Sequence, residues 1–299
     1  MKKKIFLSGV GGMLGEAFYK IFSKNYELKC TDIDVNEKWL EHLDFRDAEK
    51  YSLLVEKFNP DYLFHIGAYT DLEFCEKNQE ETFITNTESV KTAVRISNDK
   101  NIPLLYISTA GIFDGKKNSY DEDDTPKPIG TYAISKYEAE KFVIQNSKKF
   151  LICRAGWMMG GGPKKDKKFI QKIIQQIKDG NKELFIVDDK FGTPTYTYDF
   201  AKNTETLIDT NNFGLFNMAC EGNTSRLEVA EEILKILNLS DKIKVNKVKS
   251  EYFNKTFFAE RPNSENLINK KLNQKGLNLM RPWKETLREY INTSYVNYL

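Results

Sequence analysis

The chain has 299 residues, of which 40% are apolar and 13% aromatic, so it can bury a sizeable core as one large domain or two unequal ones. Its 45 Lys and Arg residues against 43 Asp and Glu leave a formal charge of +2, which excludes an overall attraction to nucleic acid or to an anionic membrane. Because the net charge is small, any anionic ligand must bind a local site. No apolar run approaches the roughly 20 residues that a bilayer-spanning helix needs.

Short apolar runs alternate with longer amphipathic stretches in the first half of the chain. The runs that indicate buried strands are Ile5–Leu7, Leu28–Cys30, Tyr62–Ile66, Leu104–Ile107 and Phe150–Cys153. Strands and helices in this alternation predict an α/β fold of the Rossmann type, with a doubly wound parallel sheet and right-handed crossovers.

The rhythm loosens after Arg154. The features that follow are a glycine cluster at Gly160–Gly162, a helix from about Lys167 to Lys178, a strand at Leu184–Val187, a helix at Ser225–Leu237 and a closing helix after Pro282. We predict an NAD(P)-binding Rossmann domain over residues 1–155, with a returning strand and helix near 184–210. Residues 156–183 and 211–299 then form a smaller substrate-binding domain that supplies a ligand cleft.

A glycine-rich turn follows the first strand directly and opens an amphipathic stretch. In a dinucleotide site the first glycine, Gly9, permits a tight turn, the second, Gly12, lets the backbone approach the pyrophosphate, and the third, Gly15, allows close helix packing. The helix N-terminus offers free N–H groups to the phosphates. The cofactor-binding residues predicted in and after this turn are Gly9, Gly12, Met13, Leu14, Gly15 and Asp32.

Asp32 bears on the choice of cofactor. It ends the second strand twenty residues after Gly12, where a carboxylate can bind the adenosine ribose hydroxyls, and this favours NAD. Lys29 and Arg46 lie nearby in sequence and could offset its repulsion of a 2′-phosphate, so NADP stays open. The alternative interpretation of Asp32 is a helix cap or turn residue, the role that we expect for Asp34.

Tyr132 and Lys136 are four residues apart, which places both side chains on one face of a helix. Carbonyl reduction needs a hydride on carbon and a proton on oxygen. A nearby ammonium lowers the pKa of a tyrosine hydroxyl from about 10 and makes it a better proton exchanger. Thr109 follows a strand, at the sheet edge where open α/β folds bind ligands, and can orient the substrate oxygen against Tyr132.

Several motifs along the chain occur together in one known family. They are Gly9–Gly15, Leu43–Asp47, Gly67–Thr70, Tyr106–Gly115, Tyr132–Lys136, Arg154–Trp157, Phe191–Thr195 and Arg261–Ser264. With them the chain resembles the extended short-chain dehydrogenase/reductases, and within these the dTDP-4-dehydrorhamnose reductase-like group. The resemblance implies that Asp44 and Phe45 flank the adenine and that Gly67, Ala68 and Tyr69 lie along the cofactor.

The same resemblance implies the reaction. The nicotinamide delivers hydride to the 4-keto carbon of a nucleotide-linked sugar, Tyr132 supplies the proton, and Lys136 holds the nicotinamide ribose while tuning Tyr132. Thr109 completes the catalytic trio. The residues that the resemblance and their residue types assign to the substrate are Thr70, Ala110, Trp157, Phe191, Thr193 and Arg261.

The chain departs from the group's pattern at two places. The usual Asp-Tyr after the threonine is Ala110-Gly111 here, which removes an acid and an aromatic beside the sugar. The same change argues against sugar-nucleotide dehydration, because Ala110 and Gly111 can neither protonate nor deprotonate the sugar. The asparagine that often precedes the substrate-loop phenylalanine is Lys168, for which we expect a solvated side chain rather than a phosphate contact.

Three functions remain open. The first is reduction of a nucleotide-linked 4-keto-6-deoxyhexose for surface-polysaccharide synthesis. The second is an NDP-sugar 4-epimerase, which uses the same trio but keeps NAD bound and regenerates it. The third is a non-catalytic, NAD(P)-binding regulatory subunit, like that of methionine adenosyltransferase, although intact Thr109, Tyr132 and Lys136 argue against it.

Other reactive side chains have plainer interpretations. His65 lies inside an apolar run and is expected to be a hydrogen-bonded structural residue, and Asp121–Asp124 lacks the spacing of metal ligands and is expected to form a solvated loop. The four scattered cysteines favour neither a zinc site nor a disulfide framework. We therefore expect a cytoplasmic protein, a monomer or homodimer, that binds neither metal, nucleic acid nor membrane.

Overall fold

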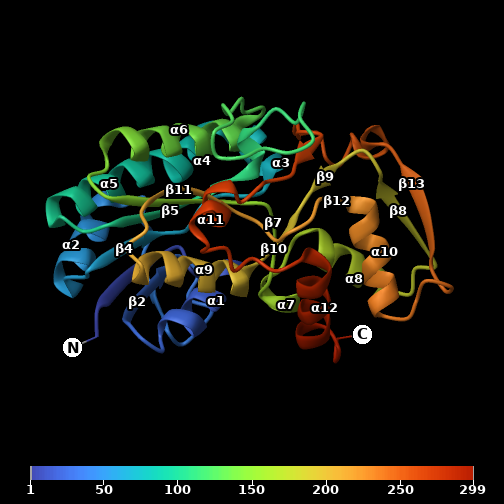
Figure 1. Cartoon of the computed structure of the whole chain (residues 1–299), viewed down its shortest axis with the longest axis horizontal. Coiled ribbons are helices and arrows are strands. Elements are labelled where there is room, and N and C mark those ends of the chain that lie inside the picture. Colours follow the sequence, from blue (N-terminus) through green and yellow to red (C-terminus); the bar gives the residue numbers. More distant parts are fainter. Residues whose placement is uncertain (1, 299) are drawn as a thin grey trace.

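Seven parallel strands form the central sheet in the computed structural model, which describes residues 2–298 (Figure 1). Their order across the sheet is β11-β6-β5-β4-β1-β2-β3. Because β1 lies between β2 and β4, the winding reverses there, as a doubly wound sheet requires. The strands are β1 Lys4–Ser8, β2 Glu27–Asp32, β3 Leu40–His42, β4 Tyr62–His65, β5 Leu104–Thr109, β6 Phe150–Ala155 and β11 Gly214–Met218.

Helices cover both faces of the sheet because the central strands are apolar on both sides. In β1, Ile5 and Leu7 pack into one core with α1 and α9, whereas Phe6 between them packs into a second core with α2, α5 and α6. Burial on both faces explains why these strands appear as continuous apolar runs. The helices of this part are α1 Met13–Phe22, α2 Ala48–Phe58, α3 Leu72–Lys77, α4 Gln79–Phe83, the π-helix η1 Ile84–Glu88, α5 Ser89–Lys100, α6 Thr131–Asn146 and α9 Thr197–Asp209.

The predicted α/β fold and its five strands are confirmed, but the returning strand is not the predicted one. The strand at Leu184–Val187 exists as β8, yet it pairs with β13 outside the central sheet. The strand that joins the sheet is β11, which follows α9 and pairs with β6. Helix α9 is thus the returning helix that was predicted near 184–210, and it leads to β11, which lies in the segment 211–299 that the sequence assigned to the substrate-binding domain. The division into two domains stays a prediction.

Most of the smaller part of the molecule lies to the right of the sheet in Figure 1, whereas its helix α11 lies against the sheet beside β11. Its elements are β7 Trp157–Met159, α7 Gly162–Lys165, α8 Phe169–Lys178, β8 Glu183–Val187, β9 Phe191–Gly192, β10 Pro194–Tyr196, β12 Thr224–Ser225, α10 Arg226–Ile236, β13 Lys244–Val248, β14 Ser264–Glu265, α11 Lys270–Lys275 and α12 Trp283–Ser294, with 3-10 turns η2 Ala110–Ile112 and η3 Ser250–Phe253. The three helices predicted after Arg154 are therefore confirmed. Ser225 and Glu228 form a capping box that starts α10.

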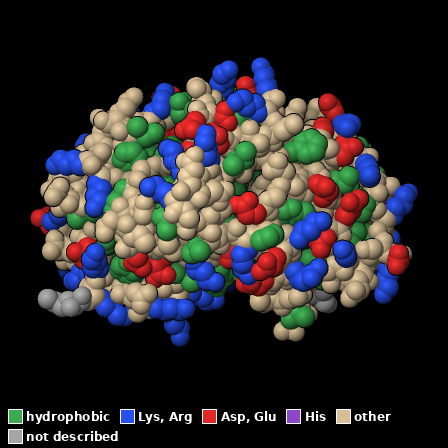
Figure 2. Space-filling model, in the orientation of Figure 1, with side chains coloured by type: hydrophobic (Ala, Val, Ile, Leu, Met, Phe, Trp, Pro, Cys, Tyr) green, Lys and Arg blue, Asp and Glu red, His purple; other side chains and the backbone are tan. Residues whose placement is uncertain are grey.

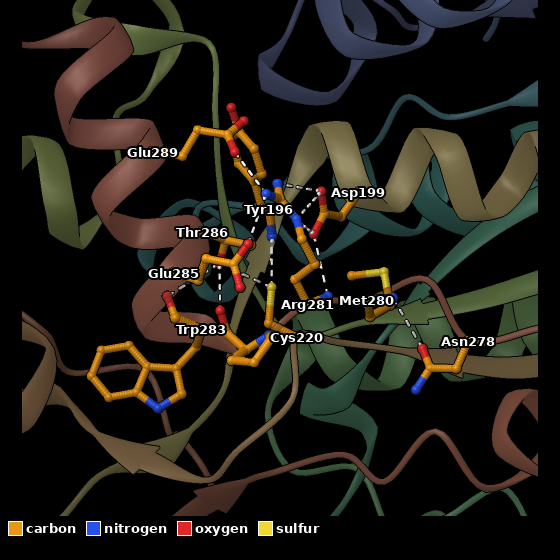
Figure 3. A network of polar contacts seen from close by, with 11 residues as sticks. Tyr196, Asp199, Cys220, Asn278, Met280, Arg281, Trp283, Glu285, Thr286 and Glu289 are labelled. Carbon is orange, nitrogen blue, oxygen red and sulfur yellow. Dashed lines mark hydrogen bonds and ion pairs between the residues drawn. The ribbon is translucent and has the colours of Figure 1, made fainter.

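A polar network joins the closing helix to the central part (Figure 3). Arg281, just before α12, donates to both carboxylate oxygens of the buried Asp199 on α9, the closest contact being 2.8 Å. Its other nitrogen contacts Glu289 at 2.7 Å and Glu285 at 3.2 Å. The network holds α12 against α9 and so holds the smaller part in place against the sheet.

The surface carries charges of both signs. On the face in Figure 2, blue and red side chains alternate without a large patch of one sign, as a net charge of +2 suggests. Within residues 2–298, none of the helices combines the length and hydrophobicity that crossing a bilayer requires.

Candidate active site

A cleft runs along the carboxyl ends of β1, β2, β4 and β5, between the sheet and the smaller part of the molecule. Residues from the glycine turn, the ends of these strands, helix α6 and the smaller part all line it. The predicted cofactor and catalytic residues that line it are Gly9, Gly12, Met13, Leu14, Gly15, Asp32, Asp44, Phe45, Gly67, Ala68, Tyr69, Thr109, Tyr132 and Lys136. Of the predicted substrate residues, Thr70, Trp157 and Arg261 line it as well.

The three glycines of the turn have the separate roles that their positions suggest. Gly9 has φ +74°, and a Cβ there would lie 2.2 Å from the Cα of Gly67. A Cβ on Gly15 would lie 1.7 Å from the carbonyl oxygen of Val10, so only glycine allows α1 to pack this closely. At Gly12 a Cβ would meet nothing within 4 Å, and no side chain caps the helix there. The N-terminus of α1 therefore faces open space with unbonded N–H groups, which suits a pyrophosphate.

Asp32 supports the turn as well as lining the cleft. Its carboxylate accepts hydrogen bonds from the backbone N–H groups of Gly11 at 2.7 Å and Asp34 at 2.9 Å. A Cβ on Gly11 would lie 2.9 Å from the Asp32 carboxyl carbon, so the acid and the turn are in contact. Asp32 thus has the turn role that the sequence left open, and its remaining lone pairs face the cleft beside Ile33.

The two cations offered by the sequence for a 2′-phosphate both have acidic partners. Arg46 donates to Asp44 at 2.7 Å and to Glu81 at 3.2 Å, and its guanidinium lowers the pKa of Asp44. Lys29 pairs with Glu41 across β2 and β3. Neither side chain is therefore available to relieve the repulsion between Asp32 and a second phosphate without giving up an ion pair.

Asn86 is a site-supporting residue that the sequence did not single out. It lies on the π-helix η1, a distortion that is common beside functional sites. Its amide accepts from Tyr69 N at 2.8 Å and donates to Tyr69 O at 3.0 Å and to Ser135 Oγ at 3.1 Å. Asn86 thereby joins the loop after β4 to helix α6, which carries Tyr132 and Lys136.

The catalytic trio comes together in the cleft. Thr109 ends β5, while Tyr132 and Lys136 lie on the first turns of α6. The Lys136 Nζ lies over the ring of Tyr106, 4.3 Å from its centroid, and only 3% of Lys136 is exposed. The backbone carbonyl of Lys136 accepts from the Tyr106 hydroxyl at 3.0 Å, which fixes α6 on β5.

Burial determines the pKa values of Lys136 and Tyr132. It lowers the pKa of Lys136 to about 7, against the opposing charge of Glu140. It also raises the pKa of Tyr132, although the neighbouring Thr109 hydroxyl acts in the lowering direction. The lowering of the Tyr132 pKa by Lys136 that the sequence suggested is therefore not found. The physical reason is that burial disfavours the charged form of both side chains, so Tyr132 keeps its proton.

Arg226 is a second functional candidate that sequence reasoning missed. Its guanidinium carbon lies 3.6 Å from the ring centroid of Trp157 and 4.8 Å from that of Phe169. Among residues 2–298, no carboxylate lies within ion-pair distance of it, and burial lowers its pKa to about 10 against the opposing charge of Glu265. A cation that lines the cleft between two aromatic rings without an acidic partner is suited to a phosphate.

Two cationic side chains that line the cleft, Arg261 and Lys168, already have partners within the protein. Arg261 pairs with Glu73 at 2.7 Å and donates to the carbonyl of Ala259 at 2.7 Å. We expected a solvated side chain for Lys168, but its ammonium donates to the carbonyl and hydroxyl oxygens of Thr70 at 2.8 and 3.0 Å. Lys168 therefore connects the substrate loop to the loop after β4.

Three of the predicted substrate residues do not line the cleft. Ala110 is 1% exposed and packs in a core cluster, because Thr109 and Gly111 on either side of it take the cleft positions. Thr193 is fully buried and donates to Asn266. Phe191 is 44% exposed, although it belongs to β9, the middle strand of its short sheet. None of the three lines this cleft, so their predicted substrate contacts stay predictions.

Other reactive groups have structural partners. His65 contacts Ser8 and Tyr51 at 3.2 Å through Nδ1 and Ser89 at 3.1 Å through Nε2, so it is the structural histidine that we expected. Burial and the charge of Lys136 lower its pKa to about 3. In the acidic loop, Asp121 and Asp123 pair with Lys270. Across residues 2–298, no group of three or more His, Cys, Asp or Glu side chains is arranged to hold a metal ion.

Comparison with known proteins identifies the family of this chain. A family model described as RmlD substrate binding domain matches residues 3–296. The spore coat polysaccharide biosynthesis protein SpsK of Bacillus subtilis (strain 168) is 28% identical over 290 residues, which cover 96% of both chains. A dTDP-4-dehydrorhamnose reductase from Clostridium acetobutylicum ATCC 824 has a TM-score of 0.88 at 29% identity, covering 97% of this chain and 99% of that one. The same enzyme from Bacillus anthracis str. Ames, solved in complex with NADP, has a TM-score of 0.88 at 27% identity, covering 98% and 100%.

Proposed function

Since the chain belongs to the RmlD substrate binding domain family, we propose that it reduces the 4-keto group of a nucleotide-linked 6-deoxyhexose with NADH or NADPH. The observation that carries the proposal is that Thr109, Tyr132 and Lys136 line one cleft together with the glycine turn. Two of the solved structures that resemble this chain are reductases of this kind, and the relative from Bacillus subtilis is named for polysaccharide biosynthesis. The product would accordingly serve surface-polysaccharide synthesis.

The cleft fits a nicotinamide dinucleotide. The open space at Gly12 and the uncapped N-terminus of α1 would receive the pyrophosphate, Asp32 the adenosine ribose, and Asp44 and Phe45 the adenine. Lys136 would hold the nicotinamide ribose. When bound, the cofactor supplies the hydride for the sugar carbon.

The protein supplies the proton and the orientation. Tyr132 is protonated because burial raises its pKa, so its hydroxyl can donate a proton to the carbonyl oxygen as that oxygen becomes an alkoxide. Lys136, with a pKa of about 7, exchanges protons near neutral pH and can return one to Tyr132. Thr109 donates a hydrogen bond to the same oxygen, and Arg226 holds the diphosphate of the substrate.

We further propose that NADH is preferred to NADPH, since Asp32 repels a 2′-phosphate and both Arg46 and Lys29 are engaged in ion pairs. The enzyme would work in the cytoplasm as a monomer or homodimer. Its four cysteines are buried and free, as is usual for proteins of a reducing compartment.

Turnover and one matched pair of variants test the reductase. Purified protein with NADH or NADPH and a panel of nucleotide-linked 4-keto sugars should consume the reduced cofactor. Tyr132→Phe should lower kcat by about a hundredfold or more, because the proton donor is lost, and should leave cofactor affinity nearly unchanged. Tyr137→Phe, on the same helix but outside the cleft, is the control and should behave as wild type.

Other outcomes point to the alternatives. Co-purified oxidised cofactor with interconversion of sugar epimers and no net consumption would replace the reductase by a 4-epimerase. If wild type turns over no sugar of the panel, and Tyr132→Phe and Tyr137→Phe both bind a catalytic partner protein as wild type does, a regulatory subunit would replace the reductase.

A further inference from the structure

The acid and the aromatic residue usual in the family are missing at Ala110 and Gly111, but a carboxylate from another part of the chain lies beside Gly111. Gly111 lines the cleft beside Thr109. The nearest group to a Cβ built on Gly111 is Oε1 of Glu265, at 3.4 Å. Glu265 belongs to β14, far along the chain, and it lines the same cleft. Glu265 thus occupies the space beside position 111, and a residue larger than glycine there would narrow this space.

Glu265 is held in a defined orientation. Its Oε2 accepts a hydrogen bond from the indole N–H of Trp157 at 2.7 Å. Trp157 is in turn fixed by the guanidinium of Arg226 over its ring and by Gly192, where an added Cβ would lie 2.3 Å from the indole. The backbone of Glu265 pairs with Gly192 in the sheet of β9 and β14. Side-chain entropy is therefore already lost before any ligand binds.

The other oxygen of Glu265 is available. Among the residues that the structure describes, no donor bonds to Oε1, although the side chain is half-buried. The charge of Glu265 also acts on Tyr132. It raises the pKa of Tyr132, after the larger effects of burial and Cys75, which raise this pKa, and of Thr109, which lowers it. A half-buried carboxylate oxygen with no donor of its own favours a ligand that brings a hydroxyl or another hydrogen-bond donor.

We propose that Glu265 is a substrate-binding residue that accepts a hydrogen bond from a ring hydroxyl of the sugar, in the space beside Gly111. The inference rests on the proposed function for the identity of the ligand. It assigns to Glu265 the sugar moiety alone, whereas the nucleotide and its diphosphate are bound elsewhere in the cleft. Glu265 and Gly111 together would then set which keto sugars are accepted.

Binding to pairs of ligands that differ only in the sugar tests this role. Calorimetry on the protein saturated with NAD would compare dTDP with dTDP-rhamnose, and UDP with UDP-glucose. In the pair for which wild type prefers the sugar-linked member, Glu265→Ala should weaken binding of that member by about ten- to a hundredfold and leave the bare nucleotide unchanged. Glu265→Gln should lose less, because its amide oxygen still accepts a hydrogen bond.

The control is Glu49→Gln, an exposed acid on α2, which should bind all four ligands as wild type does. The proposal is overturned if Glu265→Ala binds the sugar-linked ligands as wild type, if it weakens bare nucleotides equally, or if wild type favours neither sugar-linked ligand over its nucleotide. Sugar binding that depends on Glu265 without any consumption of NADH would refute the reductase and leave the role of Glu265 standing.

Discussion

Burial of Lys136 links the stability of the folded chain to pH. Its pKa is about 7 in the folded protein and 10.5 in an unfolded chain, so between these values the unfolded state binds more protons. Below about pH 7 the lysine is charged in both states and the cost of burying the charge is present in full. The free energy of unfolding contributed by Lys136 therefore rises with pH from about 7 toward 10.5.

A denaturation series measures this contribution. Lys136→Met removes the titrating group, so the difference in unfolding free energy, wild type minus variant, should increase from about pH 6 to about pH 8.5. The exposed Lys127→Met serves as control and should give a difference that does not change with pH. Parallel curves for wild type and Lys136→Met would contradict the assignment of a lowered pKa to this lysine.

At this scale the sequence predicted which residues meet but not all of their contacts. The glycine turn, Asp32 and the trio were found because their spacing along the chain determines their relation in a βα unit. Arg226 and Glu265 were missed because they reach the cleft from α10 and β14, and no local pattern records that approach. Ala110 and Thr193 were assigned to the substrate from their motifs alone, although their neighbours occupy the cleft-facing positions.

The ion pair of Arg281 and Asp199 is a prediction at the scale of elements (Figure 3). Asp199 is 2% exposed, so Arg281→Ala would leave a buried carboxylate of α9 without its guanidinium and free α12 from α9. We expect a loss of about 3 kcal/mol in unfolding free energy. Chemical denaturation measures it.

Arg288→Ala is the matched control. Arg288 also belongs to α12, but its side chain is 60% exposed and lies 3.7 Å from Glu232. Glu232 is 8% exposed but also lies 4.0 Å from Lys235, so loss of the solvated Arg288 guanidinium should cost only about 1 kcal/mol. If both variants lose the same stability, the network around Asp199 has no special role in attaching the closing helix.

The same scale shows how far apolar patterning determines topology. Burial on both faces makes four of the five predicted strands, β1, β4, β5 and β6, continuous apolar runs, whereas β2 contributes to one core only and has Lys29 between Leu28 and Cys30. Leu184–Val187 has the same pattern but pairs with β13, and Gly214–Met218, which begins with glycine and contains an asparagine, joins the central sheet instead. A run of apolar residues predicts a strand, but its partner depends on which helix precedes it.

For the molecule as a whole, cofactor binding should appear as added stability. A ligand that binds only the folded state at about 100 times its Kd adds about 2.7 kcal/mol. Because we propose that Asp32 binds the adenosine ribose, NADH should raise the thermal midpoint more than NADPH at equal concentration. Asp32→Asn should narrow the gap, since the charge that repels the second phosphate is gone. A larger shift with NADPH for wild type would contradict the preference.

The contact between Gly9 and Gly67 has a consequence for how this chain tolerates mutation. The two glycines come from neighbouring strands and touch backbone to backbone, and Phe45 closes over both. Because each partner already lacks a side chain, neither can become smaller to accommodate a larger residue opposite. A substitution at either position must separate the ends of β1 and β4 and displace the backbone that would contact the dinucleotide. No second change at the other position can restore the original spacing.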